Sequence, residues 1–561
     1  MIEIPNRFNV AAYLIDRNVS EGRGNKVAIE CGEQRISYAT LLENVNRTGN
    51  ALRALGVRPE ERVLILLPDI PEFLYAFFAV IKIGAVAVPT NTLLRPHEYE
   101  YILEDTRARI AIVSDGLLPQ IEQVPCERHR YLEKMVVVGK TPAEYVSFEE
   151  LLAEASAELD AEPTCKDDAA FWLYSSGSTG APKGCVHLHH DMVVCCEHYA
   201  KGILAMTEND RCYSVAKLFF AYGLGNAGYY PLFAGATTLL QPARPSPERI
   251  FADIERYRPT LFFSVPTNYS ALLAHHRQDG SEFELSSIRY GISAGEPLPA
   301  ALFHRFKERF GVEILDALGS TEMLHMVISN RPGEIRPGSS GKIIPGLGAR
   351  IVDEDDRDVP RGEIGSLLIK SDATCAGYWN QHEKTKNTFL GSWCRTGDKY
   401  FQDGDDFFWY AGRADDLFKV NGRWLSPAEV ESALISHPAV LEAAVVARED
   451  ADGLLKPAAY VVLNPERKSD RLAEELQNWV VQNLAGYKCP RWVEFIPELP
   501  KTATGKVQRF KLRALHPPVI WWGCQHYSGC SQCGLRRCGA FDAHLRRILG
   551  MTPPISACAG A

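Results

Sequence analysis

Apolar residues recur in two alternating patterns over the first part of the chain. Residues 38–55 carry apolar side chains at helical spacing, and residues 62–67 form a continuous apolar run. A second helical pattern at 72–83 leads directly into another apolar run at 85–88. Helices that alternate with short buried strands are typical of a largely parallel sheet covered by helices on both faces. The pattern therefore predicts an α/β fold for this part.

A second helix–strand series follows, and a third region differs from both. The apolar runs of the second series lie at 211–216, 237–240, 261–265 and 288–293, with helical patterns between them. Residues 338–369 are rich in glycine, valine and charged turns, which is typical of short antiparallel strands. Together the three regions predict a large N-terminal domain of parallel α/β subdomains with a small β-barrel-like subdomain.

The periodicity restarts in a compact unit after the segment 412–419. Helical patterns at 427–437 and 469–484 enclose strand-like runs at 440–447 and 458–463. We therefore expect the chain to consist of an N-terminal domain over 1–414, a small, mobile α+β domain over 415–513, and an atypical tail over 514–561.

The overall composition is that of a globular protein with more than one domain. The chain has 561 residues, of which 46% are hydrophobic and 23% are charged. Its net charge of −9 argues against a nucleic-acid partner, which would favour a basic face. The most apolar stretch, 73–89, carries Lys82 and ends at a proline. It is therefore interpreted as a buried helix running into a strand, not as a membrane span.

The N-terminus and the cysteines indicate where the protein resides. The first residues lack a basic segment followed by an apolar one, so no secretory signal is expected. Ten of the fifteen cysteines lie before residue 500, mostly in apolar surroundings and without paired spacing. Reduced thiols in a cytoplasmic protein explain them best. We therefore expect a cytoplasmic protein that acts on small molecules, and a homodimer is compatible with the sequence.

The clearest chemical signal is the stretch YSSGSTGAPKG at 174–184, which follows the strand-like run 169–173. Its glycines let the backbone turn tightly and bring N–H groups close to a ligand, while its hydroxyl groups and Lys183 add donors and positive charge. These features are typical of a phosphate-binding loop. The spacing is not that of the common P-loop. The alternative, a flexible Ser/Gly linker, would need neither the strand nor the lysine.

Three further stretches combine glycine, acid and base in ways that a core does not require. A strand-like run ends in Gly-Ser-Thr, where Glu322 is free to hold Mg²⁺ against phosphate. Asp398 follows a Thr-Gly turn, where a carboxylate can accept both hydroxyls of a ribose. Lys506 lies on a Gly/Thr loop near the chain end. Each alone is compatible with a turn acid or a solvated lysine, but their order behind the phosphate loop does not look accidental.

With these motifs the chain resembles the adenylate-forming superfamily of acyl-CoA synthetases, adenylation domains and luciferases. The resemblance spans roughly residues 8 to 513 and rests on YSSGSTGAPKG at 174–184, GSTE at 319–322, TGD at 396–398, GRADDLFKVNGRWLSPAEVE at 412–431 and PKTATGK at 500–506. Closer in, the chain is similar to the benzoate–CoA ligase subfamily in NRFNVAAYLIDRNVSEGRG at 6–24, AKLFFAYGLGN at 216–226 and GSTEMLHMVISNRPGE at 319–334.

The resemblance implies a ligase that works in two steps on ATP, Mg²⁺ and coenzyme A. A carboxylate attacks the α-phosphorus of ATP, which gives an acyl-adenylate and pyrophosphate. The thiol of coenzyme A then displaces AMP. Such chemistry needs positioning and charge neutralisation more than covalent help. A lysine on a mobile domain can supply charge in one half-reaction and leave for the other.

The resemblance also implies a role for individual residues. Lys506, Thr321 and Glu322 are the expected catalytic residues, with Lys506 at the adenylation transition state, Thr321 at the α-phosphate and Glu322 at Mg²⁺. The residues expected at ATP and AMP are Ser175, Ser176, Gly177, Ser178, Thr179, Gly180, Lys183, Glu296, Asp316, Gly319, Ser320, Asp398 and Arg413. Asp415 is the expected hinge, and Gly422 lies where the pantetheine arm is expected to pass.

The acyl pocket implied by the resemblance consists of Ala221, Tyr222, Ala294, Gly319, His325 and Lys419. A small flat cavity between Tyr222 and His325 would suit one aromatic ring, whereas a long acyl chain would need a tunnel. Benzoate is therefore the expected substrate. Hydroxybenzoate, aminobenzoate or a small aliphatic acid is the alternative within the family. His325 taken alone is equally well explained as a satisfied buried polar residue.

Other classes of protein fit the sequence less well. A P-loop kinase or NTPase would need the missing glycine spacing and would form ADP. A binding protein without activity would be expected to lack some of the charged residues that are present. The stretch His187-Leu-His-His190-Asp191 superficially suggests zinc, but histidines at i and i+2 of a strand fit the usual ligand spacings poorly.

The tail departs from the family pattern. Five of the fifteen cysteines lie beyond residue 513, in the spacing Cys524-x(5)-Cys530-x(2)-Cys533-x(4)-Cys538, with Cys558 near the end. This spacing resembles a metal knuckle only loosely. An out-of-frame or poorly ordered extension is the favoured explanation, and a metal-binding or partner-binding appendage is the alternative.

Overall fold

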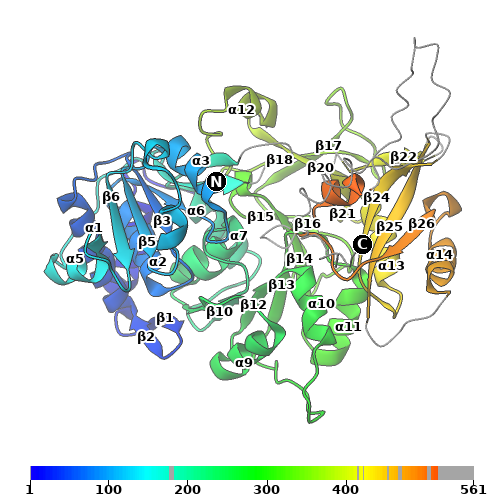
Figure 1. Cartoon of the computed structure of the whole chain (residues 1–561), viewed down its shortest axis with the longest axis horizontal. Helices are drawn as coiled ribbons and strands as arrows, with labels where there is room; N and C mark the ends of the chain where they lie inside the picture. The colour runs from blue at the N-terminus through cyan, green and yellow to red at the C-terminus, as the bar shows by residue number, and fades with distance from the viewer. Residues whose placement is uncertain are drawn as a thin grey trace, which may run out of the picture. The chain divides into compact units, whose positions relative to one another are not determined.

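The computed structural model describes residues 2–175, 182–413, 416–420, 423–450, 454–464, 471–501 and 507–515, without the side chains of Cys126, Lys419 and Trp424. Four sheets of three or more strands and a two-stranded ribbon organise these residues (Figure 1). Within these residues no helix combines the length and the apolar character that a bilayer crossing requires. The nine cysteines whose side chains are described are all free thiols.

The first sheet has seven strands in the order β7-β6-β5-β3-β4-β8-β9. Its strands are β3 (Arg62–Leu66), β4 (Val86–Pro89), β5 (Ile110–Ser114), β6 (Lys134–Val138), β7 (Val146–Ser147), β8 (Ala169–Ser175) and β9 (Lys183–Leu188). Its helices are α1 (Tyr38–Ala54), α2 (Pro71–Lys82), α3 (Pro96–Thr106), α4 (Leu118–Ile121) and α5 (Phe148–Glu154). All pairs are parallel except β8 with β9. The predicted parallel α/β arrangement is therefore confirmed here.

Helix α2 explains why the most apolar stretch of the chain is not a membrane span. Eleven of its twelve residues are buried, and nine of them pack in the apolar cluster that both large sheets share. A helix that is apolar all round is stable only when its whole circumference is covered by protein or lipid. Lys82, at its last position, pairs with Asp16 at 2.6 Å and with Asn46 at 2.7 Å, so the buried charge is compensated.

The second sheet has nine strands in the order β16-β15-β14-β13-β12-β10-β11-β1-β2. They are β1 (Val27–Cys31), β2 (Gln34–Ser37), β10 (Arg211–Ser214), β11 (Thr237–Leu240), β12 (Leu261–Ser264), β13 (Tyr290–Ser293), β14 (Ile314–Gly319), β15 (Met326–Ser329) and β16 (Lys342–Ile343). The pairs from β1 to β14 are parallel, and antiparallel strands flank them at both edges. The N-terminal strand β1 thus joins the second sheet, although it precedes the first sheet in the sequence.

Helices cover the second sheet on both faces. The helices α9 (Pro247–Tyr257), α10 (Pro266–Ala274) and α11 (Ala300–Phe310) pack on one face through a common apolar cluster (Figure 1). The other face meets α6 (Asp191–Cys195), α7 (Ala221–Leu224) and α8 (Tyr230–Ala234). Because the central strands are parallel, their carboxyl ends share one edge, where ligands bind in open α/β sheets.

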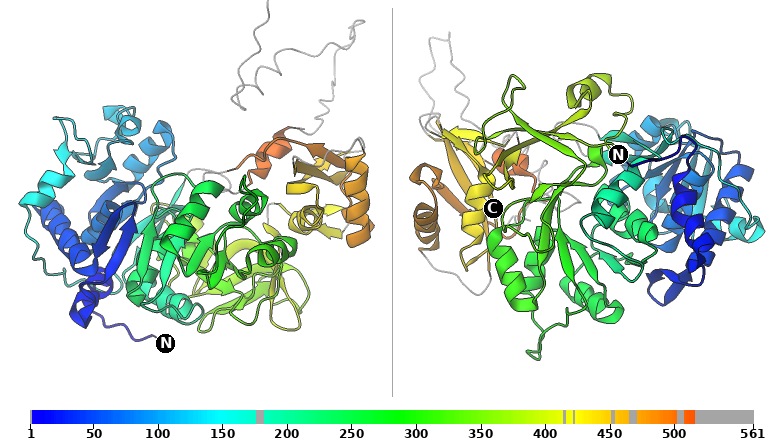
Figure 2. Two further views of the ribbon diagram at one scale, coloured as in Figure 1. Left: turned by 90° about the horizontal axis from the view of Figure 1, so that it is seen from below. Right: turned by 180° about the vertical axis from the view of Figure 1, so that it is seen from behind.

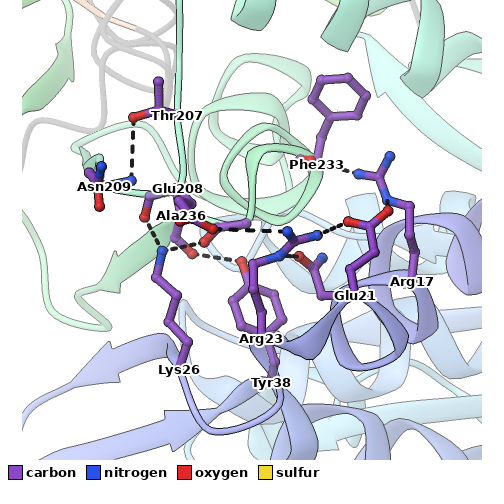
Figure 3. Close-up of polar contacts among 12 residues, drawn as sticks. Arg17, Glu21, Arg23, Lys26, Tyr38, Thr207, Glu208, Asn209, Phe233 and Ala236 are labelled. Atoms are coloured by element: carbon purple, nitrogen blue, oxygen red, sulfur yellow. Dashed lines mark hydrogen bonds and ion pairs between the residues drawn. The ribbon is translucent and has the colours of Figure 1, made fainter.

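The N-terminal segment fixes the end of α8. The π-helical turns η1 (Ala12–Asp16) and η2 (Val19–Arg23) lead into β1, and polar side chains beside these turns and at the start of α1 reach backbone carbonyls at the end of α8 and just beyond it (Figure 3). The last carbonyls of a helix lack partners within it, so external donors stabilise the end. The contacts are Arg17 to Phe233 (2.7 Å), Asn18 to Leu232 (2.7 Å), Lys26 to Gly235 (2.6 Å) and Tyr38 to Ala236 (2.7 Å).

The third sheet is antiparallel, as the glycine- and valine-rich region predicts. It contains β17 (Gly348–Val352), β18 (Gly365–Lys370), β19 (Phe389–Leu390), β20 (Trp393–Gln402) and β21 (Phe408–Arg413), next to α12 (His382–Thr388). The predicted Thr-Gly turn before Asp398 is wrong, because this motif lies inside β20. Gly397 adopts a φ of +77° there, and the bulge that follows at Lys399 bends the strand without ending it.

The last sheet belongs to the small α+β unit that the sequence predicts. Its strands are β24 (Val440–Glu449), β25 (Leu455–Leu463) and β26 (Trp492–Phe495), and the ribbon of β22 (Phe418–Val420) and β23 (Arg423–Leu425) precedes them. Helices α13 (Pro427–Ile435) and α14 (Leu472–Asn483) pack through one apolar cluster on one face (Figure 2). Leu512 of α15 (Arg509–Ala514) packs on the other face. The predicted tail, 514–561, lies almost wholly outside the described residues.

Candidate functional site

Strands β8 and β9 frame the predicted phosphate loop. The strands pair antiparallel up to the loop, so that Ser175 lies directly opposite Lys183. The base of the loop is therefore fixed by the sheet. The loop residues Ser176, Gly177, Ser178, Thr179 and Gly180 lie outside the described residues, and their contacts with phosphate stay predictions.

Lys183 and Glu322 meet at the base of this loop, and a tyrosine joins them. The Lys183 ammonium lies 3.7 Å from Glu322 Oε1 and donates to the hydroxyl of Tyr378 at 3.2 Å. That hydroxyl in turn donates to Glu322 Oε1 at 2.8 Å. The ammonium also lies 4.4 Å from the centre of the Tyr378 ring. Two predicted residues that are far apart in the sequence are thus brought together by a third that the sequence did not single out.

The charge of Glu322 is stabilised by these two neighbours. Burial by itself would raise the pKa of this carboxyl group, since its side chain is only 16% exposed. The positive charge of Lys183 and the hydrogen bond from Tyr378 outweigh burial, and the pKa of Glu322 is lowered from its usual value. The site therefore presents an ionised carboxylate beside an ammonium group, which together can hold a metal–phosphate complex.

The Gly-Ser-Thr-Glu motif forms a compact turn at the end of β14. Gly319 pairs with Met326 of β15, and a β-carbon on Gly319 would lie 2.5 Å from the carbonyl oxygen of His325. Only glycine therefore fits at this close approach. Thr321 and Glu322 then begin the short 3₁₀ helix η6 (Thr321–Met323). The turn thus brings Gly319, a residue predicted at the nucleotide, directly against His325.

Asp316 and Glu296 lie at the carboxyl edge of the second sheet. Asp316 is buried in β14, where its Oδ2 accepts the N–H of Leu298 at 3.2 Å, and burial raises its pKa well above the usual value. Its other oxygen, Oδ1, has no partner among the described residues. Glu296 accepts the backbone N–H of Val507, the residue that follows Lys506 in the sequence, at 3.2 Å.

Asp398 and Arg413 form a pair across β20 and β21. They are opposite each other in the strand register, and Arg413 donates to Asp398 Oδ1 at 3.0 Å. The carboxylate is mostly buried, whereas the guanidinium is 42% exposed. The arginine thus orients the carboxylate, and it also donates to the carbonyl of Thr396 at 3.3 Å.

Among the residues predicted for the acyl pocket, Tyr222 and Gly319 lie against His325. Ala221 begins α7, Ala294 directly follows β13, and both are buried. Tyr222 donates its hydroxyl to the carbonyls of Ser264 and Ile292, both at 3.1 Å. The ring centres of Tyr222 and His325 lie 5.8 Å apart. The side chain of Lys419 is outside the description, so its place in the pocket stays a prediction.

His325 is buried and neutral. Burial lowers its pKa to about 3, although the Tyr222 carbonyl opposes this shift. Its Nε2 lies 3.3 Å from that carbonyl and 3.2 Å from Asn226 Oδ1, and since a carbonyl only accepts, Nε2 carries the proton. A β-carbon on Gly225 would lie 2.3 Å from the ring, so glycine is needed there. The histidine therefore adds a flat, uncharged surface and no positive charge.

Three further predicted positions cannot be placed. Lys506, Asp415 and Gly422 lie outside the described residues, so the catalytic lysine, the hinge and the pantetheine passage stay predictions. The sequence missed Tyr378 and Asn226 as site residues. Tyr378 stands in the run Gly-Tyr-Trp-Asn at 377–380, where two adjacent aromatic residues in a polar loop were the available signal.

The histidine-rich stretch after the phosphate loop links three segments of the chain. His189 Nδ1 accepts the N–H of Val10 at 3.1 Å. The two ring nitrogens of His190 lie 2.9 Å from the carbonyl of Lys166 and 3.1 Å from that of Asp372. These rings thus point toward backbone groups of different segments and do not converge on one point.

Comparisons with known proteins agree with this geometry. The family described as "AMP-binding enzyme" matches residues 15–379, and "AMP-binding enzyme C-terminal domain" matches residues 429–506. The chain is 48% identical to a benzoate–CoA ligase of Thauera aromatica, over 91% of this chain and 97% of that protein. It is 43% identical to a 4-hydroxybenzoate–CoA/benzoate–CoA ligase of Rhodopseudomonas palustris, over 91% and 94%.

Solved structures are similar over the same range. A benzoate CoA ligase from Burkholderia xenovorans is 44% identical, covers 90% of this chain and all of its own, and gives a TM-score of 0.82. An anthranilate CoA ligase in complex with anthranoyl-AMP is 44% identical, covers 91% of this chain and 98% of its own, and gives a TM-score of 0.88.

Proposed function

Since the chain belongs to the AMP-binding enzyme family, we propose that it is an AMP-forming ligase that joins benzoate to coenzyme A. The observation that carries this proposal is the 48% identity to a benzoate–CoA ligase over 91% of the chain. The neutral His325 beside Tyr222 supports it, because an uncharged ring-sized site suits a phenyl group.

In the first half-reaction, a carboxylate oxygen of benzoate bonds to the α-phosphorus of ATP and pyrophosphate leaves. Lys183 and Glu322 are proposed to face the β- and γ-phosphates and their metal ion. The hydroxyl of Tyr378 would hold these two side chains in place through its hydrogen bonds to both. Thr321 would contact the α-phosphate, and Asp398 with Arg413 would bind the ribose and phosphate. Lys506 would stabilise the negative charge of the transition state.

The ionised carboxylate of Glu322 fits a Mg²⁺ ion, which binds through one or two carboxylates together with substrate phosphates. When bound, Mg²⁺ would neutralise charge on the leaving pyrophosphate. Asp316 is a less suitable ligand, because burial raises its pKa and favours its protonated form.

In the second half-reaction, the thiol of coenzyme A attacks the acyl carbon of benzoyl-adenylate and AMP leaves. We propose that Asp415 is the hinge about which residues 415–513 turn between the half-reactions. Gly422 would then line the passage of the pantetheine arm. A cytoplasmic location and a homodimer are also proposed, on the basis of the sequence alone.

The alternative substrate is a substituted benzoate. One solved relative carries anthranoyl-AMP, and relatives 35% identical to this chain act on hydroxybenzoates. A hydroxyl or amino substituent would need a hydrogen-bond partner in the pocket. The Nδ1 atom of His325 is buried and has no partner among the described residues, so it is a candidate acceptor.

The test is a panel of carboxylic acids assayed for AMP and acyl-CoA formation. Benzoate and fluorobenzoates are expected to react well, hydroxy- and aminobenzoates to differ by about 10- to 200-fold, and octanoate to be the poorest. Equal efficiency with octanoate would contradict an aromatic pocket. A clear preference for 2-aminobenzoate over benzoate would favour the alternative.

A further inference from the structure

The turn that carries Thr321 and Glu322 contains a strained residue. Leu324 has a φ of +62° and a ψ of −46°, and the N–H of His325 donates to the carbonyl of Met323 at 2.7 Å. This is a γ-turn of the rare hand, which strains the backbone of any residue other than glycine. Strained residues persist only where surrounding contacts fix them.

Two carbonyls just before Leu324 are held from outside the turn. The N–H of Cys375 donates to the carbonyl of Glu322 at 2.8 Å. The Nε2 atom of His187 lies 2.8 Å from the carbonyl of Thr321. Because a carbonyl only accepts, Nε2 carries the proton and donates it to Thr321. A side chain of β9 thus holds the residue that is expected at the α-phosphate.

The ring of His187 is itself fixed on two sides. Its Nδ1 lies 2.8 Å from Oδ2 of Asp191, which also accepts the N–H of Leu188 at 3.1 Å. The ring stacks on Phe171 of β8 with 5.1 Å between centres and 16° between planes. His187 and Asp191 are both fully buried. A ring held in this way has one orientation, and its Nε2–H points at Thr321.

We infer that His187, oriented by Asp191, is a positioning residue for the adenylation half-reaction. It fixes the Thr321 carbonyl, keeps the strained turn in place and so holds the side chain of Thr321 in position and that of Glu322 against Lys183. The inference rests on the proposed function, because Thr321 and Glu322 are the groups being positioned. His187 itself touches no substrate in this account.

Two substitutions of similar size separate the two hydrogen bonds of the ring. His187→Gln places an amide N–H where Nε2 lies, whereas His187→Asn places one only where Nδ1 lies. We expect His187→Asn to slow benzoate-dependent ATP–pyrophosphate exchange by about 10- to 100-fold, since a misplacement near 1 Å costs up to about 100-fold. The exchange rate of His187→Gln should stay within about fivefold of the wild type, because this variant keeps an N–H that faces the Thr321 carbonyl.

A merely structural role would affect both half-reactions together. Conversion of supplied benzoyl-adenylate to the thioester should therefore stay near wild type in His187→Asn, while the Mg²⁺ concentration needed for half-maximal exchange should rise. His189→Asn is the matched control, since His189 belongs to the same stretch but accepts the N–H of Val10 at 3.1 Å. It should leave the ratio of the two half-reactions unchanged.

The outcomes distinguish this inference from the proposed function. If the wild type shows no benzoate-dependent exchange, the proposed function is wrong. If the wild type exchanges but His187→Asn loses both half-reactions equally, or loses neither, the positioning role is wrong. Equal losses in His187→Gln and His187→Asn would also overturn it. Should His187→Asn not fold, Asp191→Asn is expected to show the same selective loss on a smaller scale, and a uniform loss there would overturn the inference.

Discussion

The hydroxyl of Tyr378 is expected to matter for adenylation far more than for thioester formation. It links Glu322 and Lys183, at 2.8 Å and 3.2 Å, and its side chain is only 7% exposed. Tyr378→Phe removes this hydroxyl and keeps the ring against the Lys183 ammonium. The substitution therefore removes the hydrogen bond to a charged, buried carboxylate together with the one from the ammonium.

The expected loss follows from the value of such a bond. A hydrogen bond to a charged group contributes about 1.5–3 kcal/mol, and about 1.4 kcal/mol corresponds to a tenfold change in rate. Benzoate-dependent ATP–pyrophosphate exchange should therefore fall by about 10- to 100-fold. Single-turnover thioester formation from supplied benzoyl-adenylate should stay near wild type, because pyrophosphate has already left in that step.

The pH profile gives a second readout of the same substitution. The pKa of Glu322 is lowered because Lys183 and Tyr378 outweigh burial. Without the hydroxyl group this pKa rises, so the acid limb of the exchange rate should move to higher pH. Tyr400→Phe is the control, since that hydroxyl meets Ser340 at 3.1 Å. Equal losses in both half-reactions, or equal losses in Tyr400→Phe, would refute the role assigned to Tyr378.

Three other predictions concern different parts of the molecule. Asn18→Ala should lower the free energy of unfolding by about 2–3 kcal/mol, because its buried amide donates to the carbonyls of Leu14 and Leu232. The control is Asn483→Ala, at an exposed asparagine whose amide donates to the Trp479 carbonyl, and urea unfolding is the measurement. His325 has a pKa of about 3 in the folded protein and about 6.5 in the unfolded chain. The free energy of unfolding should therefore fall by about 1.4 kcal/mol per pH unit below about pH 6.5, and His325→Phe should remove this contribution to the pH dependence. Lys506→Ala should slow exchange by about 100- to 1000-fold and spare thioester formation, whereas Gly422→Leu should do the reverse; equal effects on both steps would contradict alternation of the small domain.

The elements of regular pattern could be predicted from the sequence. The apolar runs at β3 and β4 and the helical patterns of α1 and α2 have strong periodicity, and the structure confirms them. The family and the fold class predicted from the five motifs are also confirmed by the comparisons. The sheet to which β1 belongs was not predictable in the same way, because pairing with β11 depends on contacts between residues some 200 positions apart.

The candidate site was predictable only where a motif carries its own chemistry. Lys183 and Glu322 stand in glycine-rich motifs, and the sequence singles them out. Tyr378 and His187 are different, because a tyrosine after a glycine and a histidine in a strand are common in many proteins. Their importance arises from tertiary packing that brings Tyr378 to Glu322 and His187 to Thr321. The Thr-Gly-Asp motif was wrongly predicted as a turn, because a bulged strand tolerates the same glycine.

The most direct test of the central claim follows one oxygen atom. In the proposed reaction a carboxylate oxygen of benzoate bonds to the α-phosphorus and leaves with AMP. Benzoate labelled with ¹⁸O at both carboxylate oxygens, incubated with the enzyme, ATP, Mg²⁺ and coenzyme A, should give AMP with one ¹⁸O and benzoyl-CoA that keeps the other, as read by mass spectrometry. Unlabelled AMP, or ADP with the label in inorganic phosphate, would contradict adenylate formation and with it the function proposed for this chain.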